Sequence, residues 1–175
     1  YQDALQAQKY VLRIATREHG ADSPKLAPTL EDIGRWYASI GAYDQSRRTL
    51  KEAIAIVEAA EGPDSPRLVG PLLALGTCNR LQLLDPAAQP QTTPDDGRAS
   101  MFHDPAVMIP SGYSTGMMAT EGERALQRAA DIVDRVPQPS PVPALTVRTQ
   151  LGDWYQLRNQ PERAGPHYQL AWRAA

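Results

Sequence analysis

The fold is decided by residues 24–62, which read PKLAPTLEDIGRWYASIGAYDQSRRTLKEAIAIVEAAEG. Apolar and small side chains recur along this stretch every three or four residues, which is the period of a helix and not of a strand. A glycine-containing turn at 40–42 divides the stretch, so it predicts a hairpin of two amphipathic helices. The positions expected at the contact between these helices are Leu30, Ile33, Gly34, Tyr37, Ser46, Leu50, Ala53, Ile54 and Val57.

The stretch belongs to a repeat of 42 residues. When the sequence is shifted by 42, residues 1–42 align with 43–84 without a gap, and ten positions are identical, which is hard to obtain by chance. The shared loop has Gly, Asp, Ser and Pro at 20, 22, 23 and 24, and again at 62, 64, 65 and 66. Gly favours a left-handed helix end, while Ser beside Pro is typical of the next helix start. The repeat therefore predicts helix hairpins stacked in an array.

A third copy of the repeat is displaced by an insertion. Residues 151–155 match 33–37 at a shift of 118, whereas residues 126–133 match 50–57 at a shift of 76. Because 76 − 42 = 34, about 34 residues are inserted between the two helices of the second hairpin. The insertion is assigned to residues 85–120.

These features predict a single all-α domain, residues 1–175, built as a right-handed solenoid of antiparallel helix hairpins with a long irregular insert. A net charge of −2 gives no basic footprint for nucleic acid. No apolar run reaches the ~20 residues of a membrane span. The bare helices at both ends of the array suggest self-association as an alternative role. The predicted helices span residues 1–19, 25–40, 44–61, 66–84, 121–136, 143–158 and 161–175.

The repeat resembles the tetratricopeptide repeat, and its 42-residue spacing is closest to the kinesin-light-chain-like variety. In this family the first helix of a hairpin has Leu and Gly followed by an aromatic residue, as at Leu30, Gly34 and Tyr37. The resemblance covers residues 1–84 and 121–175. It implies a non-enzymatic scaffold that binds a protein or peptide partner of unknown identity.

The resemblance also implies a concave groove lined by the first helix of each hairpin. Family members that hold a terminal carboxylate use Lys and Asn in this groove, but Glu31 and Arg35 stand in their place. The carboxylate clamp, and the Asn ladder of kinesin-light-chain-type grooves, are therefore expected to be missing. The alternative for Glu31 and Arg35 is an i, i+4 ion pair on a solvated surface. Arg47, on a second helix, is expected outside the groove. The positions expected to face a partner are Glu31, Arg35, Leu73, Thr77, Arg80, Thr149, Asp153 and Gln156.

The insertion has two parts. Residues 85–100 are rich in Pro, Gln and Asp and favour a disordered or extended chain, whereas residues 101–118 are apolar and contain every methionine. The second part is expected to pack on its own solenoid, or to act as a lid or extra contact for a partner. Binding of Cu(I) by the thioethers is a further alternative. The residues expected to make contacts are Phe102, Met108, Ile109, Tyr113, Met117 and Met118.

Residues 112–116 spell G-x-S-x-G, and His103 and Asp104 lie in the same insertion. This motif exposes a nucleophilic serine only on a strand-to-helix turn above a sheet, and no parallel-sheet pattern is present in the sequence. A flexible Gly/Ser turn is favoured over a hydrolase, so no catalytic residue is assigned and no enzyme is predicted.

The remaining reactive side chains do not form a site. His19, His103 and His167 show no ligand spacing, so neither a metal nor another cofactor is predicted. Cys78 falls on the buried side of a repeat helix and is expected to be an inert core thiol. Arg outnumbers Lys fifteen to three, and Ala and Pro are abundant, which favours a GC-rich bacterial source. The compartment stays unassigned, with the cell envelope (periplasm) favoured over the cytoplasm.

Overall fold

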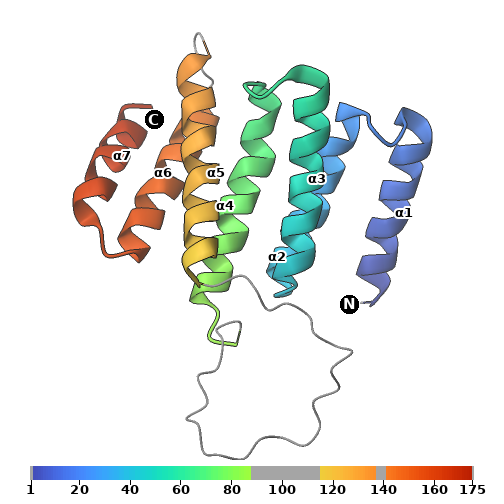
Figure 1. Ribbon diagram of the computed structural model, residues 1–175, viewed down its shortest axis with the longest axis horizontal. Helices are drawn as coiled ribbons and strands as arrows, with labels where there is room; N and C mark the ends of the chain where they lie inside the picture. Colours follow the sequence, from blue (N-terminus) through green and yellow to red (C-terminus); the bar gives the residue numbers. More distant parts are fainter. Residues whose placement is uncertain (1, 88–114, 137–140, 175) are drawn as a thin grey trace, which may run out of the picture.

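The computed structural model describes residues 2–87, 115–136 and 141–174, and the described residues form helices and no strand (Figure 1). Short 3-10 turns, η1 (Pro24–Leu26) and η2 (Pro66–Leu68), precede the second and fourth α-helices. The predicted all-α class is confirmed. The α-helices are α1 (Gln2–His19), α2 (Ala27–Ser39), α3 (Tyr43–Glu61), α4 (Val69–Leu84), α5 (Thr115–Arg135), α6 (Pro141–Leu157) and α7 (Pro161–Ala174).

The helices are arranged in two layers (Figure 1). α2 packs on α3, α4 on α5 and α6 on α7, so each pair forms one hairpin. α4 also contacts α2 on one side and α6 on the other, and these three helices make an inner layer. α1, α3, α5 and α7 make the outer layer. The arrangement is the predicted solenoid of helix hairpins.

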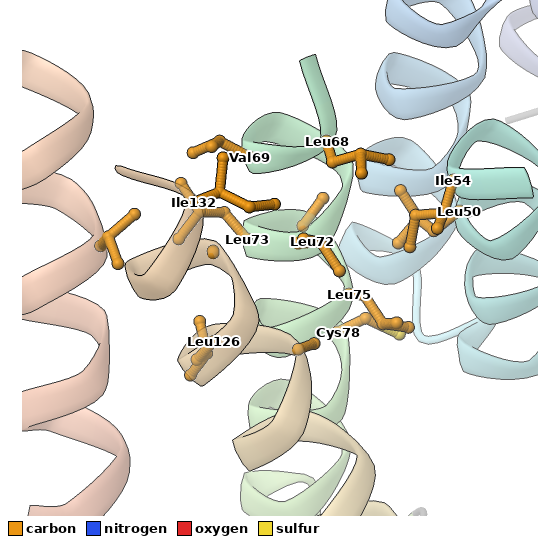
Figure 2. Packing of buried hydrophobic residues seen from close by; sticks show 14 of the residues in the cluster. Leu50, Ile54, Leu68, Val69, Leu72, Leu73, Leu75, Cys78, Leu126 and Ile132 are labelled. Atoms are coloured by element: carbon orange, nitrogen blue, oxygen red, sulfur yellow. The ribbon is translucent and has the colours of Figure 1, made fainter. Parts of the chain in front are cut away.

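α4 is the central element of the core because it is apolar nearly all round and contacts α2, α3, α5 and α6. Figure 2 shows its Leu72 and Leu75 on the side of Leu50 of α3, with Leu126 of α5 on the opposite side. All four side chains are at least 95% buried. Cys78 lies in this core as predicted, and burial raises the pKa of its thiol. A buried thiol that holds its proton is a poor nucleophile.

The loops between hairpins follow the repeated sequence. Gly20 and Gly62 have φ of +85° and +91°, so α1 and α3 each end at a glycine with positive φ. The Ser23 and Ser65 side chains each accept a hydrogen bond from the backbone N–H two residues further on. Both features agree with the prediction from the Gly-x-Asp-Ser-Pro loop, and both satisfy polar groups that a helix end leaves free.

The turn within each hairpin explains where the insertion leaves the array. Gly41 has φ of +78° between α2 and α3, and Asn159, its equivalent in the third hairpin, has φ of +55°. Leu83 holds this position in the second hairpin, and a leucine rarely adopts positive φ. α4 therefore continues as a helix to Leu84, beyond the point where the repeat would turn.

The end of the insertion differs from the prediction. α5 begins at Thr115, whereas the sequence predicts a helix only from residue 121. Within this extra length Ala119 is buried, and the Thr120 hydroxyl donates to the Gly116 carbonyl at 2.8 Å. Residues 115–120 are thus part of a packed helix and not of an irregular insert. The division into one domain with an insert stays a prediction in other respects.

The start of the insertion is tied to the α2–α3 turn. Asp85 Oδ2 accepts a hydrogen bond from the Tyr43 hydroxyl at 2.9 Å, and Asp85 Oδ1 accepts one from the Ala87 N–H at 2.9 Å. Burial and the Asp85 carboxylate raise the pKa of Tyr43 to about 12, so the phenol keeps the proton that it donates.

Candidate partner-binding surface

The predicted groove positions lie on three neighbouring helices of the inner layer. α2 contributes two of them, and α4 and α6 contribute three each. Because α4 contacts both α2 and α6, the three rows run side by side. This set is called the inner surface below, and it consists of Glu31, Arg35, Leu73, Thr77, Arg80, Thr149, Asp153 and Gln156.

On α2, Glu31 and Arg35 form the i, i+4 ion pair that is the alternative to a binding role. Glu31 Oε1 accepts from Arg35 Nε at 3.0 Å and from Nη2 at 2.6 Å. The Glu31 side chain is only 20% exposed, since its carboxylate lies against Gly70 of α4, whereas Arg35 is 55% exposed. Glu31 therefore links α2 to α4, and the guanidinium of Arg35 is the charge that faces solvent.

On α4 the three predicted positions differ in what they expose. Leu73 is only 6% exposed and packs in the core, so it offers little surface to a partner. The Thr77 hydroxyl lies 3.0 Å from the Leu73 carbonyl and 3.2 Å from Gln150 Oε1 of α6. Arg80 is half-buried and forms no ion pair with a described residue. Arg80 is therefore a cation that a ligand carboxylate can neutralise.

On α6 only one predicted position is fully open. Asp153 Oδ1 accepts a hydrogen bond from the Tyr168 hydroxyl of α7 at 2.9 Å, and burial together with this carboxylate raises the pKa of Tyr168. The Thr149 hydroxyl donates to the Leu145 carbonyl at 2.9 Å. The Gln156 side chain is exposed. Asp153 thus fixes the α6–α7 hairpin, while Gln156 remains accessible to a partner.

Gln150 was missed at the sequence level although it joins α4 to α6 through Thr77. Asp32 and Ala74 hold the equivalent positions in the other two hairpins, so the repeat contains no consistent polar residue there. Its role follows from one pair of neighbouring side chains and not from a recurring pattern.

A hollow of about 340 Å³ extends the inner surface at the N-terminal ends of α2 and α4. Three prolines give it rigid walls, and Glu31 forms the side next to the groove. Arg67 on its rim is paired with Glu61 at 2.9 Å. The lining residues are Pro24, Lys25, Ala27, Pro28, Glu31, Arg67 and Pro71.

A wider hollow of about 760 Å³ lies on the outer layer between α3 and α5, and Leu72 and Leu75 of α4 are among the residues that line it. Two ion pairs connect α3 and α5 across it, Lys51 with Glu121 at 2.5 Å and Glu58 with Arg128. Met117, from the predicted insert contacts, lines it and is 54% exposed. None of the inner-surface residues takes part in this second hollow.

Arg47 does not have the exposed position expected of an outer-helix residue. It is only 3% exposed, and its guanidinium pairs with Asp44 and donates to Gln82 of α4. The side chain lies at the α3–α4 contact, where a buried cation needs such partners. Arg47 is therefore part of the packing between hairpins, and the exposed Arg48 is the suitable outer-surface control.

Most of the predicted insert contacts, Phe102, Met108, Ile109 and Tyr113, lie outside the described residues. Met117 and Met118 belong to α5. The possible hydrolase set of His103, Asp104 and Ser114 also lies outside the described residues. The residues that the structure does describe include no strand, so they cannot form the strand-to-helix turn that the motif requires.

The described part of the chain contains neither a metal cluster nor a membrane span. Within residues 2–87, 115–136 and 141–174, no group of three or more His, Cys, Asp or Glu side chains could hold a metal ion. No helix in these segments is long and apolar enough to cross a membrane.

Comparison with known families agrees with the repeat architecture. Residues 1–59, which include α1, α2 and most of α3, match the model of the family described as tetratricopeptide repeat. The match assigns residues 1–59 to this repeat family and supports a tetratricopeptide repeat protein. No curated protein matches it. The kinesin-light-chain-like variety stays a prediction. Tetratricopeptide repeats generally mediate protein–protein interaction.

Proposed function

We propose that this chain is a non-catalytic scaffold that binds a protein or peptide partner through the inner surface. The observation that supports this most is the side-by-side arrangement of α2, α4 and α6. Glu31 of α2 lies against Gly70 of α4, and Thr77 of α4 is hydrogen-bonded to Gln150 of α6. A surface that is already ordered loses less conformational entropy when a partner binds.

The partner is proposed to be an extended or helical segment bound along its length, and not a free terminal carboxylate. Glu31 would repel a carboxylate at the place where related clamps use Lys or Asn. Arg35 and Arg80 offer guanidinium groups, which hold carboxylates in a paired geometry. An acidic side chain within the bound segment is therefore the expected contact at Arg80, with Gln156 providing a neutral hydrogen-bonding group nearby on α6.

Site-specific photocrosslinking tests the location of the surface while the partner is still unidentified. A photoreactive amino acid replaces Gln156 on the inner surface in one variant and Arg48 on α3 in a matched control, since both positions are exposed. Each variant is irradiated in extract of the source cells. We expect a discrete polypeptide adduct from position 156 and none from position 48.

An adduct from position 48 alone, or the same adduct from both positions, would contradict the proposal. Thermal unfolding of both variants establishes that the array is folded. A Gln156→Ala variant, added as a competitor during irradiation, reports whether the amide itself contributes to binding.

The insert is proposed to act as a lid or extra contact near this surface, on the sequence argument that residues 101–118 are too apolar to prefer water. Residues 88–114 lie outside the described residues, so this part of the proposal depends on sequence alone. It is tested separately by the replacement described in the Discussion.

A further inference from the structure

α7 is the last described helix of the array, and Figure 1 shows no other helix on its far side. Trp172 projects from it with 82% of its side chain exposed, which is unusual for so large an aromatic residue. Gly165, on the same helix, has open space around it, because a Cβ added there would meet nothing within 4 Å.

The repeat identifies this part of α7 as a packing surface. Trp172 is equivalent to Ile54 of α3 and Ala130 of α5. Those two residues are 9% and 4% exposed, on outer helices that are each followed by an inner helix packed against them. The equivalent surface of α7 is not covered by any described helix.

Trp172 and Gly165 make this surface complementary to itself. They are seven residues apart, which places them on the same side of the helix, two turns from one another. If a second α7 runs antiparallel across the first, with a twofold axis near residues 168 and 169, each indole lies over the glycine of the other helix. Twofold pairing of this kind presents one surface patch to its own copy.

The charges beside this surface are also compatible with antiparallel pairing. Glu162 near the start of α7 and Arg173 near its end are both exposed. They lie on the same flank of the helix as judged from 100° per residue. In the antiparallel arrangement, each Glu162 approaches the Arg173 of the other copy, so unlike charges meet on that flank.

We propose that two copies of this chain associate through α7, with Trp172 of each placed over Gly165 of the other. The other exposed helix, α1, has Tyr10, Val11 and Ile14 on its surface but contains no glycine that would receive a large side chain. Among the described helix surfaces at the two ends of the array, a large exposed side chain (the knob, Trp172) and a glycine with open space around it (the gap, Gly165) occur together only on α7.

Sedimentation equilibrium of the full chain, from low micromolar concentration to about 1 mM, tests this proposal. We expect a monomer–dimer equilibrium for the unchanged protein. Trp172→Ala removes the knob, and Gly165→Leu fills the gap with a side chain that has room in the monomer. Each should weaken the dimer by about tenfold or more, which is the effect of losing a central interface contact.

Thermal unfolding at low concentration is the control for both variants, and each should melt as a folded monomer. Tyr10→Ala on α1 is the matched surface substitution and should leave the dimer unchanged. A protein that stays monomeric over the whole range overturns the proposal. So does a dimer that Gly165→Leu leaves intact, or one that Tyr10→Ala abolishes, because association would then use another surface. If a helix from a different polypeptide covers Trp172 in place of a second copy, that result also overturns the proposal.

Discussion

Three glycines set the distance between the helices of each hairpin. Gly34, Gly76 and Gly152 hold equivalent positions in α2, α4 and α6. A Cβ at each would lie within 2.4 to 2.6 Å of a large side chain on the following outer helix. The side chains concerned are Leu50, Leu126 and Tyr168.

Replacing Gly34 with alanine is therefore expected to destabilise the array although alanine favours helix. Overpacking costs ~1–3 kcal/mol, against a gain in helix propensity of ~1 kcal/mol. Gly165→Ala is the matched control, since its surroundings are open and the same gain of ~1 kcal/mol should appear as stabilisation. Urea unfolding of the two variants measures both effects. An unchanged midpoint for Gly34→Ala would show that Leu50 can move away without cost.

His167 makes the fold sensitive to mild acid. It stacks on Tyr155 with ring centroids 5.5 Å apart and lies close to Arg148 and Arg163. Burial, and then these two guanidinium groups, lower the pKa of His167, while Asp134 opposes the shift. The unfolded chain therefore takes up this proton more readily than the folded chain does.

The part of the free energy of unfolding that depends on His167 should accordingly have its full value above the ordinary histidine pKa of about 6.5. It should decrease as pH falls below that value. Urea titrations between about pH 7.5 and about pH 5.5 measure this dependence, above the range in which most carboxylates titrate. His167→Gln should flatten it. His19→Gln, at the exposed end of α1, is the matched control and should not. The same slope in His167→Gln and in the unchanged protein would assign the dependence to other groups.

The helices themselves could be predicted largely from the sequence, because the 42-residue repeat combines apolar periodicity with explicit loop signals. α2 and α3 lie within a residue or two of the predicted ranges. The start of α5 at Thr115 could not be predicted, since residues 115–118 precede the position that aligns with Tyr43, the first residue of α3, and the repeat has no helix there. The burial of Arg47 was also invisible, because it depends on Gln82 across the α3–α4 contact.

Replacing residues 88–114 with a short Gly-Ser linker tests the insert as an element. Asp85, bonded to Tyr43, and the first turn of α5 are both retained. The far-ultraviolet circular dichroism should stay helical, because α4 and α5 still pack on one another. If the insert acts as a lid, partner affinity should rise. If it is an extra contact, affinity should fall. Loss of the folded array would instead make the insert part of the core and exclude both roles.

At the scale of the whole molecule, the class of fold was predicted correctly, and the eight inner-surface positions differ in what they offer a partner. The register of the repeat predicts Leu73 and Asp153 at the groove because both lie on inner helices. Register gives the side of a helix, but it does not show that Leu73 is covered or that Asp153 is bonded to Tyr168. Arg35, Arg80 and Gln156 are the inner-surface positions whose polar groups a partner can contact most directly.

The central claim is that recognition takes place on the inner layer. It is tested most directly by the affinity of the crosslinked partner, once purified, for Arg80→Glu on α4 and for Arg48→Glu on α3. Isothermal titration calorimetry should show at least about a tenfold loss for Arg80→Glu, or about 1.4 kcal/mol, and about none for Arg48→Glu. Equal losses for the two variants, or a loss for Arg48→Glu alone, would contradict the claim.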